Sequence, residues 1–228
     1  FSVSPGEKIA IVGPTGSGKS TTAALLRRFY DPLSGQVCID GHDLRTLSQD
    51  SIGRHVSMVL QEPFLFSGTI FENIRYASVT KDAADVERVA RAVGAHDFIA
   101  RLPGDYQFVL DQGGGNLSLG QRQLLSFARA LVADTRILVL DEATANVDSY
   151  SERKIQRALK VLLEGRTAIV IAHRLATIRD CDRILVLNHG RLVEEGSHQE
   201  LVELDGLYAR LCRLNYASFD DVPSSAIR

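Results

Sequence analysis

The sequence lacks both a long hydrophobic run and an excess of charge of one sign. Its longest apolar runs are short, as in Ile137–Leu140, whereas a membrane span needs about 18 or more such residues in a row. The 228 residues include 26 basic and 28 acidic side chains, which gives a formal net charge of −2. A near-neutral chain has no basic patch for nucleic acid, so we expect no nucleic-acid partner. The composition is typical of a soluble cytosolic domain.

Cysteine is also scarce. Cys38, Cys181 and Cys212 are odd in number and far apart in the chain. This excludes the disulfide framework of a small secreted domain and the Cys-x-x-Cys pairs of zinc sites. We interpret each cysteine as a small buried apolar residue in a reducing compartment.

An initiator methionine and a signal sequence are absent. The chain starts at Phe1 and enters a strand-like pattern within eight residues. We therefore expect it to be a piece of a longer protein. Its length suits one large domain or two small ones.

Short apolar runs alternate with segments of helical period, which predicts an α/β fold. We expect strands at Lys8–Val12, Gln36–Ile39, His55–Leu60, Arg136–Leu140, Thr167–Ala172, Arg183–Leu187 and Arg191–Glu195. We expect helices at Thr22–Phe29, Asp82–Val93, His96–Arg101, Leu119–Val132 and Glu200–Leu214.

Strand signals thin out in the middle of the chain, and helical ones dominate there. We interpret residues 68–133 as a helical subdomain inserted into a core made of residues 1–67 and 134–214. The last helix is expected to bury one apolar face that includes Leu201, Leu204 and Leu214. Residues 215–228 are rich in Ser, Asp and Pro and are expected to form a disordered tail.

The strongest motif is G-x-x-x-x-G-K-[ST], between a predicted strand and a predicted helix. In such a loop the backbone N–H groups surround phosphates at a helix N-terminus. The Lys19 ammonium would bind the β- and γ-phosphates, and the Ser20 hydroxyl can ligate Mg²⁺. These features predict a P-loop NTPase core. The residues expected to bind the nucleotide are Gly13, Pro14, Thr15, Gly16, Ser17, Gly18, Lys19, Ser20 and Thr21.

Two neighbouring carboxylates follow the apolar run Ile137–Leu140. A buried strand would deliver Asp141 to the carboxyl edge of the sheet, beside the phosphate loop, where it can hold Mg²⁺. Glu142 is aimed differently and can polarise the attacking water as a general base. The pair therefore predicts metal binding and hydrolysis.

Kinases, GTPases, helicases and transporters share these two motifs, so the rest of the chain has to distinguish them. An N-K-x-D segment for guanine is missing, which counts against a GTPase. The segment Leu117-Ser118-Leu119-Gly120-Gln121 resembles the LSGGQ signature of ATP-binding-cassette (ABC) proteins. Over residues 1–214 the remaining motifs follow in that family's order: Gln61 after a strand, Asp141-Glu142, Asn146-Val147-Asp148, and His173 after a strand. The resemblance implies the ABC ATPase fold, a RecA-like core with an inserted helical subdomain, here without its first N-terminal strand or strands.

The resemblance also implies ATP and Mg²⁺ as cofactors and a second ABC nucleotide-binding domain as partner, in a head-to-tail homodimer or heterodimer. In that family ATP is sandwiched between two domains. Ser118, Gly120 and Gln121 of one domain would contact ATP on the phosphate loop of the other, with Leu119 at the same interface.

Within one domain the resemblance implies further roles. Gln61 would coordinate Mg²⁺ and the attacking water, and His173 would contact the γ-phosphate. With Glu142 and Lys19 they form the expected catalytic set. Asp148 would contact the opposing domain and link the two ATP sites.

Two segments resemble the exporter branch of the family, 28–41 and 64–74. The resemblance implies that residues 61–75 and 111–116 contact the transmembrane domains of the same transporter. It also implies a location at the cytoplasmic face of the inner membrane. The expected activity is ATP hydrolysis that drives export of a substrate.

The sequence departs from the family at three points. Leu119 replaces the first glycine of LSGGQ, and we expect its Cβ to restrict the backbone and crowd the start of the helix. Gln112 stands where exporters usually carry a glutamate. The family's adenine-stacking aromatic residue would lie upstream of Phe1, so we expect this chain to bind ATP more weakly than one with that strand restored.

Two other functions fit the same motifs. One is a soluble ABC ATPase that works on DNA or ribosomes. Its DNA-repair members would carry a long coiled coil between Ser20 and Ser118, where fewer than 100 residues intervene here. A catalytically silent, regulatory half usually lacks Glu142 or His173, and both are present. The sequence thus favours an exporter motor.

Overall fold

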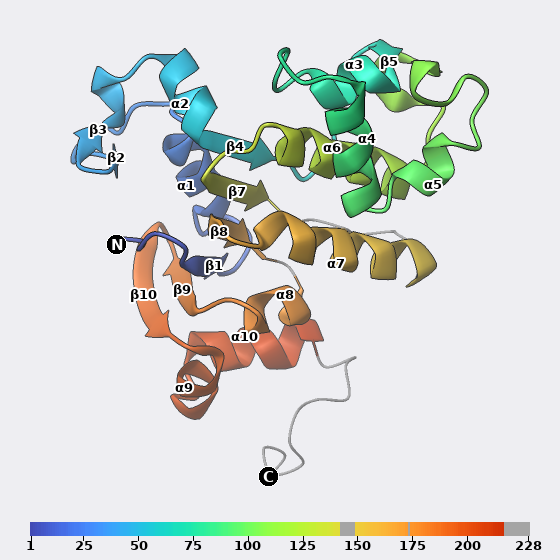
Figure 1. Cartoon of the computed structure of the whole chain (residues 1–228). Coiled ribbons are helices and arrows are strands. Elements are labelled where there is room, and N and C mark those ends of the chain that lie inside the picture. The colour runs from blue at the N-terminus through green and yellow to red at the C-terminus, as the bar shows by residue number, and fades with distance from the viewer. Residues whose placement is uncertain (142–148, 173, 217–228) are drawn as a thin grey trace.

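A six-stranded sheet lies at the centre of the computed structural model, which describes residues 1–141, 149–172 and 174–216 (Figure 1). In spatial order its strands are β10 (Arg191–Gly196), β9 (Arg183–Asn188), β1 (Lys8–Val12), β8 (Thr167–Ile171), β7 (Ile137–Asp141) and β4 (Val56–Val59). The strands from β9 to β4 run parallel, and β10 pairs antiparallel with β9. The predicted α/β class is confirmed.

Helices cover both faces of this sheet. Alternate residues of a strand point to opposite faces, so Ile9 and Ile11 pack with Ala23 of α1 (Lys19–Leu26) and Ile52 of α2 (Gln49–His55). Ala10 and Val12 belong to a larger cluster on the other face. That cluster includes apolar residues of α6 (Leu119–Val132), α7 (Ser149–Leu163), α8 (Leu175–Arg179), α9 (His198–Glu203) and α10 (Leu207–Tyr216).

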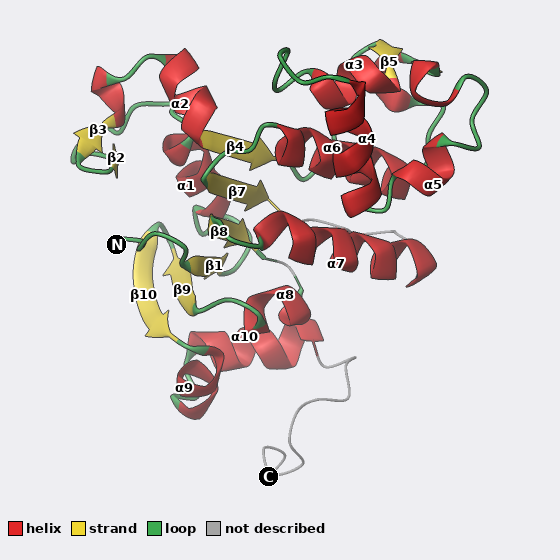
Figure 2. Cartoon of the chain, in the orientation of Figure 1, coloured by secondary structure: helices red, strands yellow, loops and turns green. Residues whose placement is uncertain are grey.

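The chain between β4 and β7 is largely helical, as expected for residues 68–133 (Figure 2). It contains α3 (Ile70–Arg75), α4 (Ala83–Ala92), α5 (His96–Ile99) and α6. It also contains a small antiparallel pair, β5 (Gly68–Thr69) with β6 (Val109–Leu110), which the sequence did not predict. Strands of two residues are too short to show a period. The division of residues 1–214 into a core and a helical subdomain stays a prediction.

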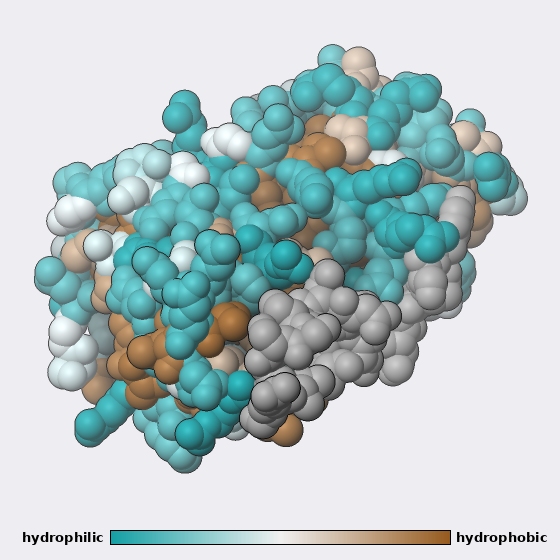
Figure 3. All heavy atoms as spheres, turned by 90° about the horizontal axis from the view of Figure 1, so that it is seen from below, coloured by the Kyte–Doolittle hydropathy of each residue, from teal (hydrophilic) through white to brown (hydrophobic). Residues whose placement is uncertain are grey.

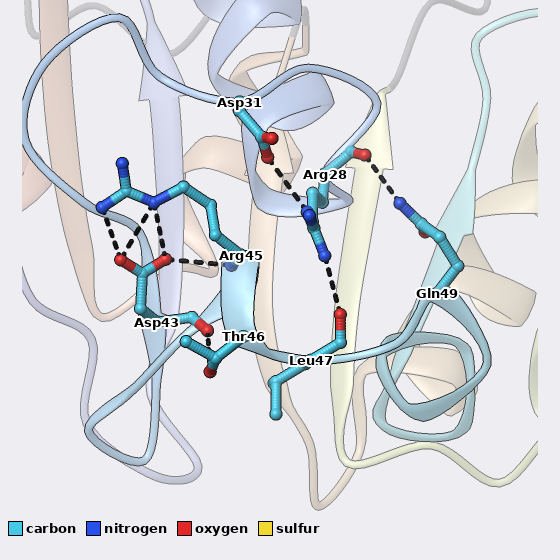
Figure 4. Close-up of polar contacts among 7 residues, drawn as sticks. All are labelled: Arg28, Asp31, Asp43, Arg45, Thr46, Leu47 and Gln49. Atoms are coloured by element: carbon cyan, nitrogen blue, oxygen red, sulfur yellow. Dashed lines mark hydrogen bonds and ion pairs between the residues drawn. The ribbon is translucent and has the colours of Figure 1, made fainter.

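Helix α1 begins three residues earlier and ends three residues earlier than the predicted Thr22–Phe29. Its end is set by Arg28, which adopts a left-handed φ of 54°. Figure 4 shows how this turn is held: the Arg28 guanidinium donates to the Leu47 carbonyl (2.7 Å) and to Asp31, and Gln49 donates to the Arg28 carbonyl (2.9 Å). These partners come from later in the chain, so the period of the helix alone could not place its end.

A small hairpin follows, formed by β2 (Cys38–Ile39) and β3 (His42–Asp43). Strand β2 is shorter than the strand expected at Gln36–Ile39. Cys38 is exposed and Cys181 only partly buried, so the burial expected for each cysteine is confirmed for Cys212 alone. Just after the hairpin, the Arg45 guanidinium donates to both carboxylate oxygens of Asp43, to Oδ2 at 2.6 Å and to Oδ1 at 3.2 Å (Figure 4).

The single helix predicted at Glu200–Leu214 is wrong, because the structure has two helices there, α9 and α10. Asp205, between them, has a left-handed φ of 51°. The Glu194 carboxylate on β10 then accepts hydrogen bonds from the backbone N–H groups of Leu207 and Tyr208 at the start of α10. Leu204 and Leu214, expected on the buried face, are exposed.

Helix α10 reaches Tyr216, two residues into the expected tail, and residues 217–228 lie outside the described residues. Figure 3 shows apolar side chains gathered on the face formed by β10, α9 and α10, where Leu192, Val193 and Val202 are exposed. None of the helices in the described ranges is both long enough and apolar enough to cross a membrane.

Candidate nucleotide-binding site

The predicted phosphate loop connects the carboxyl end of β1 to the N-terminus of α1. Gly18 precedes the helix with a left-handed φ of 103°, and no side chain caps the helix. The first N–H groups of a helix have no acceptor inside it, so those of α1 are open to a ligand. Ser20 and Thr21 are exposed beside them. The start of α1 is therefore suited to bind an anion.

Gly13 allows the loop to pass close to the end of β9. A Cβ atom placed on Gly13 would lie 2.2 Å from the Leu187 carbonyl oxygen, and its φ is 153°. The loop is also held by the turn after β9, because the Gly190 N–H donates to the Ser17 carbonyl (3.0 Å). Sequence reasoning missed this support, which joins residues far apart in the chain.

The Lys19 side chain lies over the loop and is 8% exposed. Its Nζ donates to the carbonyl oxygens of Gly13 (2.8 Å) and Pro14 (2.9 Å). Burial lowers the pKa of the Lys19 ammonium, and the nearby Asp141 carboxylate opposes that shift. The effect of Asp141 on Lys19 indicates that the phosphate loop and the acidic end of β7 lie close together.

Asp141 is the last residue of β7 and pairs with Ile171 of β8, which pairs with Ile11 of β1. Asp141 is thus level with the end of β1, at the edge of the sheet where the phosphate loop begins. Mg²⁺ bound with a nucleotide needs only one or two protein oxygens besides phosphate and water. The Ser20 hydroxyl and the Asp141 carboxylate are hard oxygen donors of that kind. Among the described residues no group of three or more His, Cys, Asp or Glu side chains is placed to hold a metal ion by itself, and a magnesium–nucleotide site requires none.

Gln61 follows β4 by two residues and is exposed. Because Val59 of β4 pairs with Leu140 of β7, Gln61 comes off the sheet at the same edge as Asp141. Glu142, Asp148 and His173 lie outside the described residues. The Ala172 N–H donates to the Ile11 carbonyl (3.4 Å), so the chain before His173 reaches this edge as well.

The segment that resembles the signature begins α6. The Ser118 hydroxyl accepts from the Gln121 N–H (3.2 Å), and the Gln121 side chain accepts from the Ser118 N–H (2.9 Å). This capping box stabilises the helix start. Leu119 is the first residue of the helix and is not among the described residues with positive φ, so its Cβ causes no left-handed strain there. A helical conformation suits any L-residue. The expected restriction of the backbone and crowding of the helix start stay predictions.

Gly120 has a packing role that the sequence did not predict. A Cβ atom placed there would lie 3.1 Å from Cβ of Ser151, in the first turn of α7. Gly120 therefore lets α6 and α7 approach closely at their N-terminal ends.

The two segments expected to contact a membrane partner lie close together. Strand β5 of residues 61–75 pairs with β6, which ends one residue before 111–116. A Cβ atom placed on Gly114 would also lie 2.8 Å from Cδ1 of Leu65.

Phe64 and Phe66 of residues 61–75 form an exposed aromatic patch with Tyr76, the next residue after that segment, and the Phe66 and Tyr76 rings stack at 4.4 Å. Beneath this patch, Arg129 of α6 donates to the Phe64 carbonyl and to Asn73. Tyr76 and Arg129 were not singled out from the sequence, because their contacts are tertiary.

Comparison with known proteins places the chain in a family. The model of the ABC transporter family matches residues 1–145. The uncharacterized ABC transporter ATP-binding protein YknV of Bacillus subtilis is 51% identical over 218 residues, which cover 96% of this chain and 36% of that protein. An ATP-dependent lipid A-core flippase of Methylobacillus flagellatus is 49% identical over 218 residues, covering 95% of this chain and 37% of the flippase. The chain thus spans little more than a third of these relatives.

A solved structure is also similar. A bacterial Atm1-family ABC exporter with ATP bound superposes with a TM-score of 0.88 at 43% sequence identity. The match covers 97% of this chain and 38% of the exporter chain. The similarity extends through the sheet, the helices on both of its faces and the helical segment between β4 and β7.

Proposed function

The chain belongs to the ABC transporter family, and from that premise we propose that it is the ATP-hydrolysing motor of an exporter. The observation that carries the proposal is the uncapped N-terminus of α1, which follows β1 at the same edge of the sheet where Asp141 and Gln61 follow β7 and β4. Phosphate, metal and water can meet there. The relatives named as an ATP-dependent flippase and as an exporter with ATP bound support ATP as the nucleotide.

In the proposed mechanism the N–H groups of the phosphate loop and of the first turn of α1 hold the phosphates of ATP. Lys19 exchanges its bonds to loop carbonyls for bonds to the phosphates and neutralises their charge. Ser20 and Asp141 would hold Mg²⁺, which supplies charge stabilisation on the transferred phosphoryl group. Gln61 orients water, Glu142 accepts its proton, and His173 contacts the γ-phosphate.

The proposed assembly contains two such domains arranged head to tail. Ser118 at the exposed start of α6, with Gly120 and Gln121, addresses ATP on the partner domain, and the positive end of the helix dipole favours the negative charge. Leu119 lies at the same contact, and Asp148 links the two sites.

The proposed membrane contacts use residues 61–75 and 111–116, where the aromatic patch of Phe64, Phe66 and Tyr76 is exposed. Closure of two domains on ATP would thereby pull on transmembrane domains elsewhere in the protein. The motor is proposed to lie at the cytoplasmic face of the membrane.

Replacing Glu142 tests the chemistry. The substitution Glu142→Gln keeps the size of the side chain and removes the base, so we expect ATP to bind with an unchanged dissociation constant. We expect the hydrolysis rate to fall by about 100-fold or more. Phosphate release and nucleotide titration measure the two quantities.

Glu164→Gln is the matched control, because Glu164 lies just after α7, away from the predicted motifs, and is exposed. Near-normal turnover in Glu142→Gln would remove that residue from the proposed role.

A further inference from the structure

An ion pair joins the stretch of chain that follows His173 to the stretch that follows Asp148. The Arg174 guanidinium donates to the Glu152 carboxylate. Arg174 directly follows His173, and Glu152 lies in the first turn of α7, four residues after Asp148. The pair therefore ties the chain after β8 to the helix that follows β7.

This pair is more shielded than the ion pairs along single helices. The Arg174 side chain is 17% exposed and that of Glu152 is 40% exposed. By contrast, the Arg91–Glu87 pair joins two residues of α4 at 58% and 44% exposure. A pair within one helix cannot fix one element against another, whereas the Arg174–Glu152 pair can, and partial burial strengthens its charge-assisted hydrogen bond.

The backbone on the Arg174 side of the pair is itself anchored. The Ile178 N–H donates to the Arg174 carbonyl (3.1 Å) at the start of α8. Two residues earlier, Ala172 is bonded to Ile11 of β1. Movement of the Arg174 side chain would thus displace the backbone that continues from strand β8 of the central sheet.

The same turn of α7 also contacts the signature segment. Ser151, next to Glu152, packs against Gly120, as the 3.1 Å approach of a Cβ atom placed on Gly120 indicates. The first turn of α7 therefore lies between the start of α6 on one side and Arg174 on the other.

We propose that Glu152 and Arg174 are positioning residues for ATP hydrolysis, which hold the chain after His173 against the turn of α7 that supports the signature. The inference rests on the ATPase function proposed above. As positioning residues the two act through the backbone that they hold, so their removal should lower the catalytic rate constant and leave ATP binding intact. A small misplacement of catalytic groups lowers rate steeply.

The experiment measures kcat, KM and the ATP dissociation constant of the chain with Glu152→Gln, Arg174→Gln, both together, and the charge exchange Glu152→Arg with Arg174→Glu. We expect each single substitution to lower kcat about tenfold and to change the dissociation constant less than about twofold. The double variant should be no slower than either single variant, because the two act as a unit. The charge exchange should recover most of kcat, and Arg91→Gln and Glu87→Gln should keep the wild-type rate.

Distinct results would overturn the inference. Single variants with wild-type kcat and a lower melting temperature would leave the pair a purely structural role. Multiplied effects in the double variant, or a lost ATP affinity equal to the lost kcat, would also contradict it. Arg174→Lys replaces any single variant that fails to fold, and it should retain part of the rate. A wild-type chain that hydrolyses no ATP would instead reject the proposed function itself.

Discussion

Gly13 lies close to the end of β9 and to the turn that joins β9 to β10, although these segments are far from it in the sequence. The G-x-x-x-x-G-K-[ST] pattern predicts a phosphate loop, because the requirement for glycine and lysine is local. The contacts of the loop with Leu187 and Gly190 could not be predicted, since they join residues more than 170 positions apart. The pattern thus predicts what the loop binds, and the tertiary structure explains why its first glycine is needed.

Substitution of that glycine should cost far more than substitution of a neighbouring one. Gly13→Ala places a methyl group against the Leu187 carbonyl, so we expect unfolding to require about 3 kcal/mol less free energy. Gly16→Ala is the matched control, because Gly16 also has positive φ (79°) but has nothing within 4 Å of its Cβ position. It should cost about 1 kcal/mol of backbone strain.

Urea unfolding without nucleotide measures both variants, which keeps any effect on ATP binding out of the comparison. Equal urea midpoints for the two alanine variants would show that the close approach of Gly13 to the Leu187 carbonyl does not determine the loss of stability.

At the scale of elements, helices with local signals were predicted best. Leu119–Val132 has the predicted bounds, because Ser118 and Gln121 form its capping box within four residues. The predicted helix Glu200–Leu214 failed because its break depends on Glu194, a residue of the preceding strand. A helical period continues through such a break, so it cannot reveal a cap supplied from outside the helix.

Removal of this external cap should destabilise α10. Glu194→Gln weakens the hydrogen bonds from the Leu207 and Tyr208 N–H groups, and the expected loss is about 1 kcal/mol, or about 2–4 °C in melting temperature. Glu203→Gln, an exposed change at the end of α9, should leave the melting temperature unchanged. Thermal unfolding followed by circular dichroism checks both, and identical curves would mean that the carboxylate is dispensable.

For the whole molecule, the motifs predicted which residues follow the strands at one edge of the sheet, but they did not predict the order of the strands. The phosphate loop, Asp141 and Gln61 follow strands that are separated in the sheet by as many as two others. The order β10-β9-β1-β8-β7-β4 arises from pairing across the chain, which no single segment encodes. Glu142, Asp148 and His173 lie outside the described residues, so their roles stay predictions.

The oligomeric state of the chain should depend on ATP. Membrane domains normally hold two motors near each other at high effective concentration, and without them the contact is weak. We expect a monomer without nucleotide and a dimer when Glu142→Gln is saturated with ATP and Mg²⁺. Sedimentation velocity distinguishes the two, and a tight dimer without nucleotide would contradict the expectation.

The bonds from Lys19 to the Gly13 and Pro14 carbonyls have a thermodynamic consequence for nucleotide capture. They keep the loop in one conformation before any phosphate arrives, so little conformational entropy remains to be lost on binding. The step that nucleotide binding must drive is then the transfer of the Lys19 ammonium from carbonyl oxygens to phosphate oxygens, because the backbone of the loop is already in place.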